Sequence, residues 1–333
     1  MIPLEQLENF VRKSLGLSMS TQLMFAPLPV RGSDRTFFRV TMNGGNSVIV
    51  IHYNPARIEN SYYADIAVFL HSIGVTVPAV FGHDPEQHVM VMEDAGNTDL
   101  WSFRTLPWEE RRTHYCRTIE TVYRLHDFPV KDFPFGKIKL MDRFDTALYR
   151  WEHDYFREHF VEKVCGIVPE VSQTKALGDE LVTLADRMEK TERCLIHRDL
   201  QSQNIMMCEG KPFLIDFQGM RPGSRFYDLG SLLNDPYAML SEKEVLELLG
   251  YCYSSSKKDM EWVFFMEHFW EASAQRLMQA LGAFGFLGKT KGLKTFLDYI
   301  PAGLAVLERV TMHTPALPAL RRLVEECRRA LKL

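Results

Sequence analysis

A loop between two short apolar runs constrains this chain more than any other feature. The stretch CLIHRDLQSQNIMMCEGKPFLIDFQGM, residues 194–220, carries two acids and an amide at fixed places around that loop. Asp199 follows the first apolar run, Asn204 lies five residues later, and Asp216 ends the second run. We read the two runs as strands of a small hairpin with a turn at Glu209-Gly210-Lys211. Strand-end loops bracketed by a tight turn bring such side chains around one small volume.

These three side chains suit a magnesium-dependent transfer of phosphate. Mg²⁺ prefers hard oxygen ligands and keeps part of its water shell, so one amide and one carboxylate can share it with nucleotide phosphates. This interpretation assigns Asn204 and Asp216 to the metal. Asp199 is then left to orient an acceptor hydroxyl and take its proton. The alternative is that His-Arg-Asp at 197–199 is a chance tripeptide and that the two acids are ordinary turn residues. This alternative is disfavoured because the Asn and the Asp-Phe pair follow in the order and at the spacing that the chemistry needs.

Three charged residues follow the metal loop. Asp228 precedes a helical run, where it caps the helix or holds the catalytic loop through backbone amides, and we favour structural support over direct chemistry. Arg221 and Arg225 are candidates to meet phosphate or an acidic substrate, and a solvated surface is the alternative for both.

The pattern along the chain changes near residue 94. Residues 1–93 contain an amphipathic helix, a hairpin that turns at Asn43-Gly44-Gly45, a second helix and two more short strands, which together indicate a small α+β lobe. From Leu100 onward the periodicity is mostly helical. No linker rich in Pro, Gly and Ser separates the parts, so this change of pattern alone predicts lobes at 1–93 and 94–333.

Composition excludes several classes of protein. The 333 residues are 46% hydrophobic and 25% charged with a net charge of -4, which is ordinary for a globular protein, and the cations are scattered. We therefore expect no nucleic-acid or membrane partner, and nothing in the sequence implies a protein partner. The six cysteines form no CxxC pair, and no apolar run approaches the roughly 20 residues that span a bilayer. The N-terminus is unlike a signal peptide, and we expect a cytoplasmic protein.

Six segments together resemble a known family: HRDLQSQNIM, IDFQG, YDLGSLLNDPY, VMEDAGNTDL, LYRWEHDYFREHF and QRLMQALGAFGFL. They resemble the aminoglycoside phosphotransferase family of the protein-kinase-like superfamily. Within that family they are most similar to the bacterial anomeric sugar kinases of cell-wall recycling, which phosphorylate N-acetylmuramate and N-acetylglucosamine at C1. The segments are spread over most of the chain. The resemblance implies a bilobal fold with a small antiparallel-sheet N-lobe and a larger, mainly helical C-lobe.

The resemblance also implies ATP and Mg²⁺ as cofactors and gives roles to individual residues. It makes Asp199 the catalytic base, with Asn204 and Asp216 as metal ligands. The stretch PVRGSDRTFFRV takes the place of the loop that covers the nucleotide. The residues implied to bind nucleotide lie in this loop and at the hinge between the lobes, and they are Gly32, Ser33, Arg35, Met92 and Glu93.

Departures from the protein-kinase pattern carry information. Gln201 stands where Ser/Thr protein kinases have Lys, and no APE segment follows DFQ, so a protein acceptor is disfavoured. Gln218 replaces the Gly of DFG, so a flip of the backbone at this position would meet a side chain that glycine lacks. This predicts a fixed active conformation. The strand SVIVIHYNP lacks the Lys that usually pairs the α- and β-phosphates. Candidates to replace it are Arg35, Arg39 and Arg57.

The leading hypothesis is a kinase that phosphorylates a sugar hydroxyl, at the anomeric position of an N-acetylated amino sugar. Its acceptor pocket is predicted between the catalytic loop and the helices after Asp235. The substrate candidates are Gln201, Arg221, Arg225 and Arg150. Glu152 and Asp154 lie near Arg150 in sequence and could contribute, and a solvated helix face is the alternative for Arg150 and these two acids.

Two other functions stay open. One is an aminoglycoside or amino-alcohol phosphotransferase, because a cationic acceptor calls for acids and LNDPYAMLSEKEVLE supplies several; helix-surface charge explains them equally well. The other is a nucleotide-binding pseudokinase that acts as an interaction module, motivated by the missing strand Lys and the altered DFG. The joint presence of Asp199, Asn204 and Asp216 argues against this second alternative.

Overall fold

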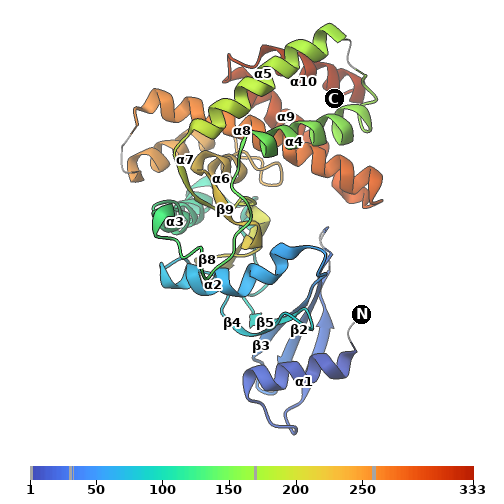
Figure 1. Cartoon of the computed structure of the whole chain (residues 1–333), viewed down its shortest axis with the longest axis vertical. Helices are drawn as coiled ribbons and strands as arrows, with labels where there is room; N and C mark the ends of the chain where they lie inside the picture. The colour runs from blue at the N-terminus through green and yellow to red at the C-terminus, as the bar shows by residue number, and fades with distance from the viewer. Residues whose placement is uncertain (1–2, 30–31, 33, 169–170, 257–259) are drawn as a thin grey trace.

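The computed structural model describes residues 3–29, 32, 34–168, 171–256 and 260–333. An antiparallel sheet lies at the N-terminal end and helices build most of the remainder (Figure 1), which confirms the predicted α+β fold. No helix in these ranges is long and apolar enough to cross a bilayer. The α-helices are α1 (Leu4–Leu15), α2 (Tyr63–Ser72), α3 (Trp108–His126), α4 (Thr146–Phe156), α5 (Val171–Lys190), α6 (Arg225–Leu233), α7 (Glu242–Ser255), α8 (Trp262–Gly285), α9 (Ile300–Met312) and α10 (Pro318–Leu331).

The large sheet has five strands in the order β1-β2-β3-β5-β4, and each neighbouring pair is antiparallel. The turn predicted at Asn43-Gly44-Gly45 joins β2 to β3. Gly44 and Gly45 have φ angles of 95° and 86°, in the left-handed range that glycine adopts at little cost. The strands are β1 (Leu23–Pro27), β2 (Thr36–Met42), β3 (Ser47–His52), β4 (Val80–Asp84) and β5 (Val89–Glu93).

Alternating side chains give the sheet two faces with different cores. Val50 and Val91 belong to a small core that α1 covers. Ile51 and Met90 belong to the main core, together with apolar side chains of α2 and of the helical part. The division of the chain between residues 93 and 94 stays a prediction, because this continuous core runs across it.

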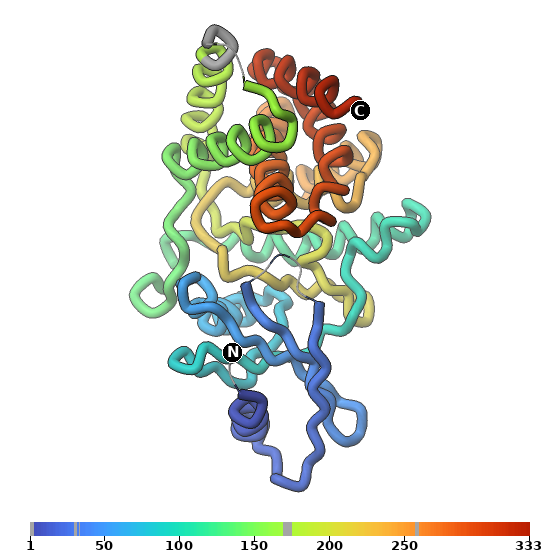
Figure 2. Tube along the Cα trace, turned by 90° about the vertical axis from the view of Figure 1, so that its right-hand side faces the viewer, coloured from blue at the N-terminus to red at the C-terminus, as the bar shows by residue number. Residues whose placement is uncertain are grey.

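Helix α8 is the centre of the helical part and packs against α4, α6 and α9. Two glycines allow the close approach. A Cβ on Gly285 would lie 2.1 Å from the carbonyl oxygen of His159, and a Cβ on Gly230 of α6 would lie 3.0 Å from the Cα of Ser273. Larger residues at these positions would push apart the helices that carry the site. Figure 2 shows the C-terminal helices at the end of the molecule opposite the first strands.

Two short strand pairs inside the helical part carry the loops of the predicted site. β6 (Arg193–Ile196) pairs with β9 (Arg221–Ser224), and β7 (Ile205–Cys208) pairs with β8 (Lys211–Leu214). The prediction of one hairpin between RCLIH and PFLID is therefore wrong, because the intervening run IMMC is the partner of the second segment. The tight turn lies where predicted, with Gly210 at a φ of 73°.

Candidate active site

The loop after β6 is held in place by one buried carboxylate of α6. Asp228 is fully buried and accepts hydrogen bonds from the backbone N–H groups of His197 (2.7 Å) and Arg198 (2.8 Å). It also contacts Nε2 of His126 at 3.0 Å. Of the two roles considered for Asp228, the structure therefore shows the holding of the catalytic loop.

His197 joins the catalytic loop to the loop after β8. Its Nε2 lies 2.9 Å from the carbonyl oxygen of Ile215, and its Nδ1 accepts from the N–H of Asp199 at 3.3 Å. A neutral ring that donates through Nε2 satisfies both contacts. The N–H of Ile215 in turn donates to the carbonyl oxygen of Asn204 at 3.0 Å. These bonds bring the two loops side by side.

The structure gathers the three side chains that the sequence singled out. Asn204 is buried, and its Nδ2 donates to the backbone oxygen of Asp199 at 2.9 Å, which leaves the amide oxygen for a cation. Asp216 directly follows Ile215, whose N–H is bonded to Asn204. The side chain of Asp199 is 28% exposed, so a substrate can reach its carboxylate.

Asp216 has an uncommon backbone and a crowded carboxylate. Its φ is 65°, and the next ring, Phe217, is fully buried and stacks on Tyr63 of α2 with centroids 4.2 Å apart. The Asp216 carboxylate accepts from Arg35 and, at 3.0 Å, from Nε2 of Gln218. Burial alone would raise the pKa of Asp216, but the charge and hydrogen bond of Arg35 and the bond from Gln218 hold it below its usual value.

The residues present fit a hydrated magnesium ion. Asn204 and Asp216 supply one amide and one carboxylate oxygen, and no group of three or more His, Cys, Asp and Glu side chains in the described ranges, here or elsewhere, is placed to hold a metal. The Oε1 atom of Gln218 is buried with no hydrogen-bond partner among the described residues. Since buried polar atoms are nearly always satisfied, this orphan acceptor beside Asp216 suits a water molecule of a metal's hydration shell.

The residues predicted to bind the nucleotide make contacts of different kinds. Arg35, just before β2, bonds to Asp216, whereas Ser33 lies outside the described residues. Gly32 has a φ of 70°, and a Cβ there would lie 3.0 Å from the ring of Phe296 in the helical part. Met92 is buried at the end of β5, and the next residue, Glu93, exchanges two hydrogen bonds with Ala79 through its N–H and its carboxylate.

Of the arginines considered as replacements for the strand Lys, the structure brings one to the site. Arg39 makes a two-pronged contact with Asp94 at 2.6 and 2.9 Å, at the connection between the lobes. Arg57 forms an exposed pair with Asp34 at 2.9 Å. Arg35 alone of the three bonds to a metal-ligand candidate.

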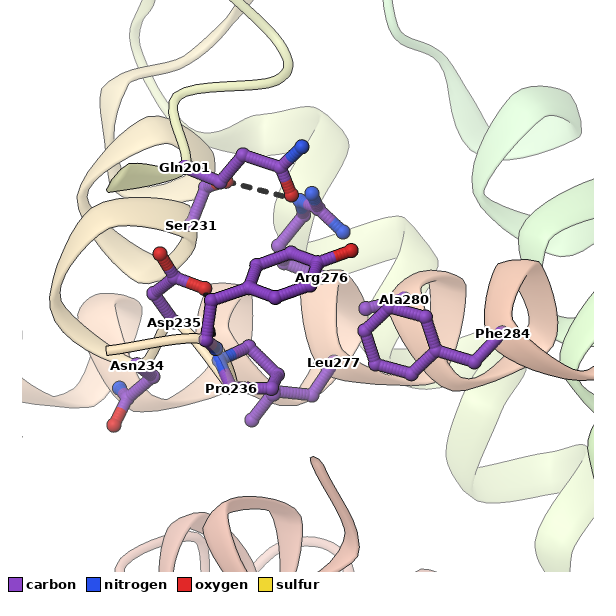
Figure 3. Close-up of a pocket in the computed structure, with 10 residues that line it drawn as sticks. Gln201, Ser231, Asn234, Asp235, Pro236, Arg276, Leu277, Ala280 and Phe284 are labelled. Carbon is purple, nitrogen blue, oxygen red and sulfur yellow. Dashed lines mark hydrogen bonds between the residues drawn. The ribbon is translucent and has the colours of Figure 1, made fainter. Parts of the chain in front are cut away.

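A pocket lies beside the Arg276–Asp199 ion pair, between the catalytic loop and the helices α6 and α8, of which α8 follows Asp235 as predicted and α6 precedes it (Figure 3). About 230 Å³ of space there is filled by no atom, and part of this space is open to solvent. Gln201 of the catalytic loop lines the pocket, and of the lining residues it is the nearest in sequence to Asp199. The other lining residues come from α6, the turn after it and α8, and they are Ser231, Asn234, Asp235, Pro236, Tyr237, Arg276, Leu277, Ala280 and Phe284.

The other predicted substrate residues do not line this pocket. Arg221 is buried, donates to the carbonyl oxygen of Gly219 at 3.0 Å, and lies over the ring of Phe144; burial and the nearby charge of Arg198 lower its pKa to about 10. Arg225 is also buried, so a solvated surface is wrong for both. Arg150 is exposed on α4. The two acids near Arg150 differ in exposure. Glu152 is buried and accepts from Tyr227 at 2.8 Å, whereas Asp154 forms an exposed pair with Arg157.

Sequence reasoning missed Arg276, which points from α8 toward the catalytic loop (Figure 3). Its Nη2 donates to Oδ1 of Asp199 at 2.7 Å. Burial alone would lower the pKa of Arg276, but the Asp199 carboxylate holds it above its usual value. The sequence does carry a signal for Arg276, because it is the only Lys or Arg in the 24 residues of α8. An isolated cation in a largely buried helix needs a polar partner.

The fold and the paired acid and amide beside an accessible carboxylate define a small-molecule kinase with a protein-kinase-like fold. Solved structures share the fold: an ethanolamine kinase of Plasmodium vivax has a TM-score of 0.62 at 14% identity, over 96% of this chain and 91% of that one. An ADP-bound aminoglycoside phosphotransferase, APH(2'')-Ib, has a TM-score of 0.58 at 12% identity, over 92% of this chain and 99% of that one. The chain belongs to the phosphotransferase enzyme family, whose model matches residues 25–259.

The curated relatives share one name. The N-acetylmuramate/N-acetylglucosamine kinase of Neisseria meningitidis serogroup B is 26% identical over 299 residues, which cover 88% of this chain and 87% of that protein. A protein of the same name from Pseudomonas aeruginosa is 24% identical over 95% of this chain and 92% of its own length. The chain is therefore a phosphotransferase that acts on a hydroxyl of a small molecule.

Proposed function

We propose that this protein transfers the γ-phosphoryl group of ATP to the anomeric C1 hydroxyl of an N-acetylated amino sugar. The observation that carries the proposal is the position of Asp199. Arg276, which lines the pocket, holds the partly exposed carboxylate of Asp199, and the backbone oxygen of Asp199 accepts from Asn204. A hydroxyl seated in this pocket is next to a base on one side and to the phosphate-binding side of the site on the other.

Asp199 acts as the general base. It accepts the proton of the acceptor hydroxyl as the acceptor oxygen attacks the γ-phosphorus, and the bond from that phosphorus to the departing ADP breaks. An anomeric hydroxyl is more acidic than an ordinary alcohol, so a single carboxylate suffices as base. Mg²⁺ held by Asn204 and Asp216 would supply charge neutralisation at the phosphates.

The nucleotide is proposed to lie between the loop before β2 and the catalytic loop. Arg35, already beside Asp216, neutralises phosphate charge in place of the strand Lys. Gly32 approaches the phosphates through its backbone, and Met92 and Glu93 hold the adenine. Cytoplasmic location and the absence of nucleic-acid, membrane and protein partners remain part of this proposal.

The charge of the pocket favours a neutral or anionic sugar over a cationic acceptor. The acid in its lining is Asp235, whose two oxygens already accept from Ser202 (2.7 and 2.5 Å) and from the N–H of Tyr237 (2.9 Å). Burial raises the pKa of Asp235. The acids of α7 that motivated a cationic acceptor bond elsewhere: Glu242 to His313, Glu244 to Arg111 and Glu247 to Arg112. The names of the curated relatives support the same choice.

An ADP-release screen over N-acetylated amino sugars, hexoses, choline-like amino alcohols and aminoglycosides tests the proposal. We expect turnover with an N-acetylated amino sugar and loss of its reducing end, because phosphorylation at C1 blocks the free aldehyde. Turnover with an intact reducing end would rule out the anomeric position. Turnover of cationic acceptors alone would favour an aminoglycoside or amino-alcohol kinase, and nucleotide binding without turnover of any acceptor would favour a pseudokinase.

A further inference from the structure

We propose that Arg276 is a positioning residue that fixes the Asp199 carboxylate by its Oδ1 atom and leaves Oδ2 for the acceptor hydroxyl. This inference rests on the proposed function, because it assigns a partner to the catalytic base. It adds a residue of α8 to a site otherwise built from the catalytic loop and the loop after β8.

The guanidinium of Arg276 is anchored on all three of its nitrogens. Nη2 donates to Asp199 at 2.7 Å, Nε to the hydroxyl of Ser231 at 3.1 Å, and Nη1 to Oε1 of Gln279 at 2.5 Å. The side chain of Arg276 is 7% exposed, so water competes little for these bonds. A planar guanidinium held at three points loses little further entropy when it orients a carboxylate.

The Asp199 carboxylate lies in the field of Arg198, but Arg276 fixes its direction through a hydrogen bond. Within the described ranges, Arg276 is the side chain that bonds to it, and the remaining contacts of Asp199 use its backbone. Without Arg276, rotation about the Cα–Cβ and Cβ–Cγ bonds would carry the carboxylate away from the pocket or toward the cation at Asn204 and Asp216. A displacement of about 1 Å at a reacting group costs roughly 10²-fold in rate.

Three roles are separable by kinetics and thermal unfolding. A residue that acts through Asp199 changes kcat, because it affects how often the base is correctly placed when the acceptor is bound. A residue that binds the acceptor directly changes the acceptor KM. A residue that only stabilises the fold changes the melting temperature and leaves the kcat of the folded enzyme unchanged.

The test compares Arg276→Met and Arg276→Lys with the wild-type protein on the acceptor that the screen identifies. We expect a kcat about 10²-fold lower for Arg276→Met, an acceptor KM and an ATP Kd within about threefold of wild type, and partial recovery of kcat for Arg276→Lys. Ser231→Ala and Gln279→Ala each remove one anchor and should lower kcat by less. They keep the inference testable if Arg276→Met does not fold.

A matched control and a double variant complete the design. Arg187→Met removes another ion pair of α8, with Glu271 at 2.6 Å, and should lower stability without lowering kcat. In an Asp199→Ala background, Arg276→Met should cause no further loss of kcat. A folded Arg276→Met enzyme with kcat within twofold of wild type overturns the inference, and so does an undiminished effect in the Asp199→Ala background.

Failure of the proposed function would look different. If the wild-type protein turns over no acceptor, the proposed function fails, and crystal structures of the wild-type and Arg276→Met proteins then test the positioning role alone. A rotated Asp199 carboxylate in the variant supports that role, and an unchanged one overturns it.

Discussion

The guanidinium of Arg35, just before β2, donates to the carboxylate of Asp216, which lies in the loop after β8. This contact joins the segment that leads into the sheet to the catalytic loops. Burial alone would lower the pKa of Arg35, but the charge and hydrogen bond of Asp216 hold it above its usual value, and the charge of Glu59, just before α2, adds to this effect. Arg35 therefore brings positive charge to the place that the missing strand Lys would serve.

Replacing Arg35 should weaken the use of ATP. We expect Arg35→Ala to lower kcat/KM for ATP by about 10- to 100-fold, since a hydrogen bond between charged groups contributes about 1.5–3 kcal/mol. Arg35→Lys should recover part of the loss because it keeps the charge but not the planar fork. Initial rates over a range of ATP concentrations measure both variants.

Arg157→Ala is the control for this measurement. Arg157 pairs with Asp154 and Glu162 on an exposed surface, where ion pairs contribute little. The Arg157→Ala variant should leave kcat/KM for ATP unchanged. An Arg35→Ala enzyme that matches the control would assign phosphate neutralisation to another group.

Asp199→Asn should abolish most turnover while the nucleotide still binds. The amide keeps the size of the side chain but cannot take the acceptor proton, and general-base assistance contributes about 10²- to 10⁴-fold. We expect kcat to fall by a factor in that range with a modest change in ATP Kd, measured by calorimetry. Near-full kcat would remove Asp199 from this role.

The fold and the reacting trio were accessible from the sequence because their signals are local. A turn such as Asn43-Gly44-Gly45 and the spacing of Asp199, Asn204 and Asp216 are each contained in a short stretch of chain. The structure places these elements where the local pattern predicted them. The pairing of β6 with β9 was not accessible in this way, since it depends on segments about 30 residues apart that carry little alternation.

The partner of the catalytic base could not be found from local pattern. Arg276 lies 77 positions from Asp199, and nothing in either segment specifies their contact. Packing decides it, because Gly230 and Gly285 let α8 approach its neighbours closely enough for the side chain to reach the loop.

Gln218 should affect the binding of magnesium. Its Nε2 bonds to Asp216 and its Oε1 is a buried acceptor, so removing the side chain by Gln218→Gly takes away both contacts. Loss of such an outer contact typically lowers metal affinity about 10- to 100-fold. A magnesium titration of ATP-analogue binding measures the midpoint, which should move to higher concentration.

The position of Phe217 makes this variant interpretable. Phe217 is fully buried against Tyr63 and should keep the loop in place when Gln218 becomes glycine. A melting temperature close to that of wild type checks this. An unchanged magnesium midpoint in a folded Gln218→Gly protein would show that Oε1 has no part in holding the hydrated ion.

Stability should fall as pH rises through the range where Glu271 titrates. Burial raises the pKa of Glu271 to about 7, although Arg187 lies 2.6 Å away and opposes the shift. Between its usual pKa near 4.5 and about 7, the unfolded chain releases this proton while the folded protein retains it. Folding is therefore penalised progressively over this window, by about 1–3 kcal/mol in total, and the penalty is constant above it.

The variant Glu271→Gln isolates this contribution because the amide keeps the shape and cannot ionise. Other groups titrate in the same window, so the informative quantity is the difference in unfolding free energy between the two proteins at each pH. Urea unfolding from pH 4.5 to 8 should show wild type losing stability relative to Glu271→Gln as pH rises, with a plateau above about pH 7. A difference that is constant with pH would mean that the pair with Arg187 keeps Glu271 ionised throughout the window.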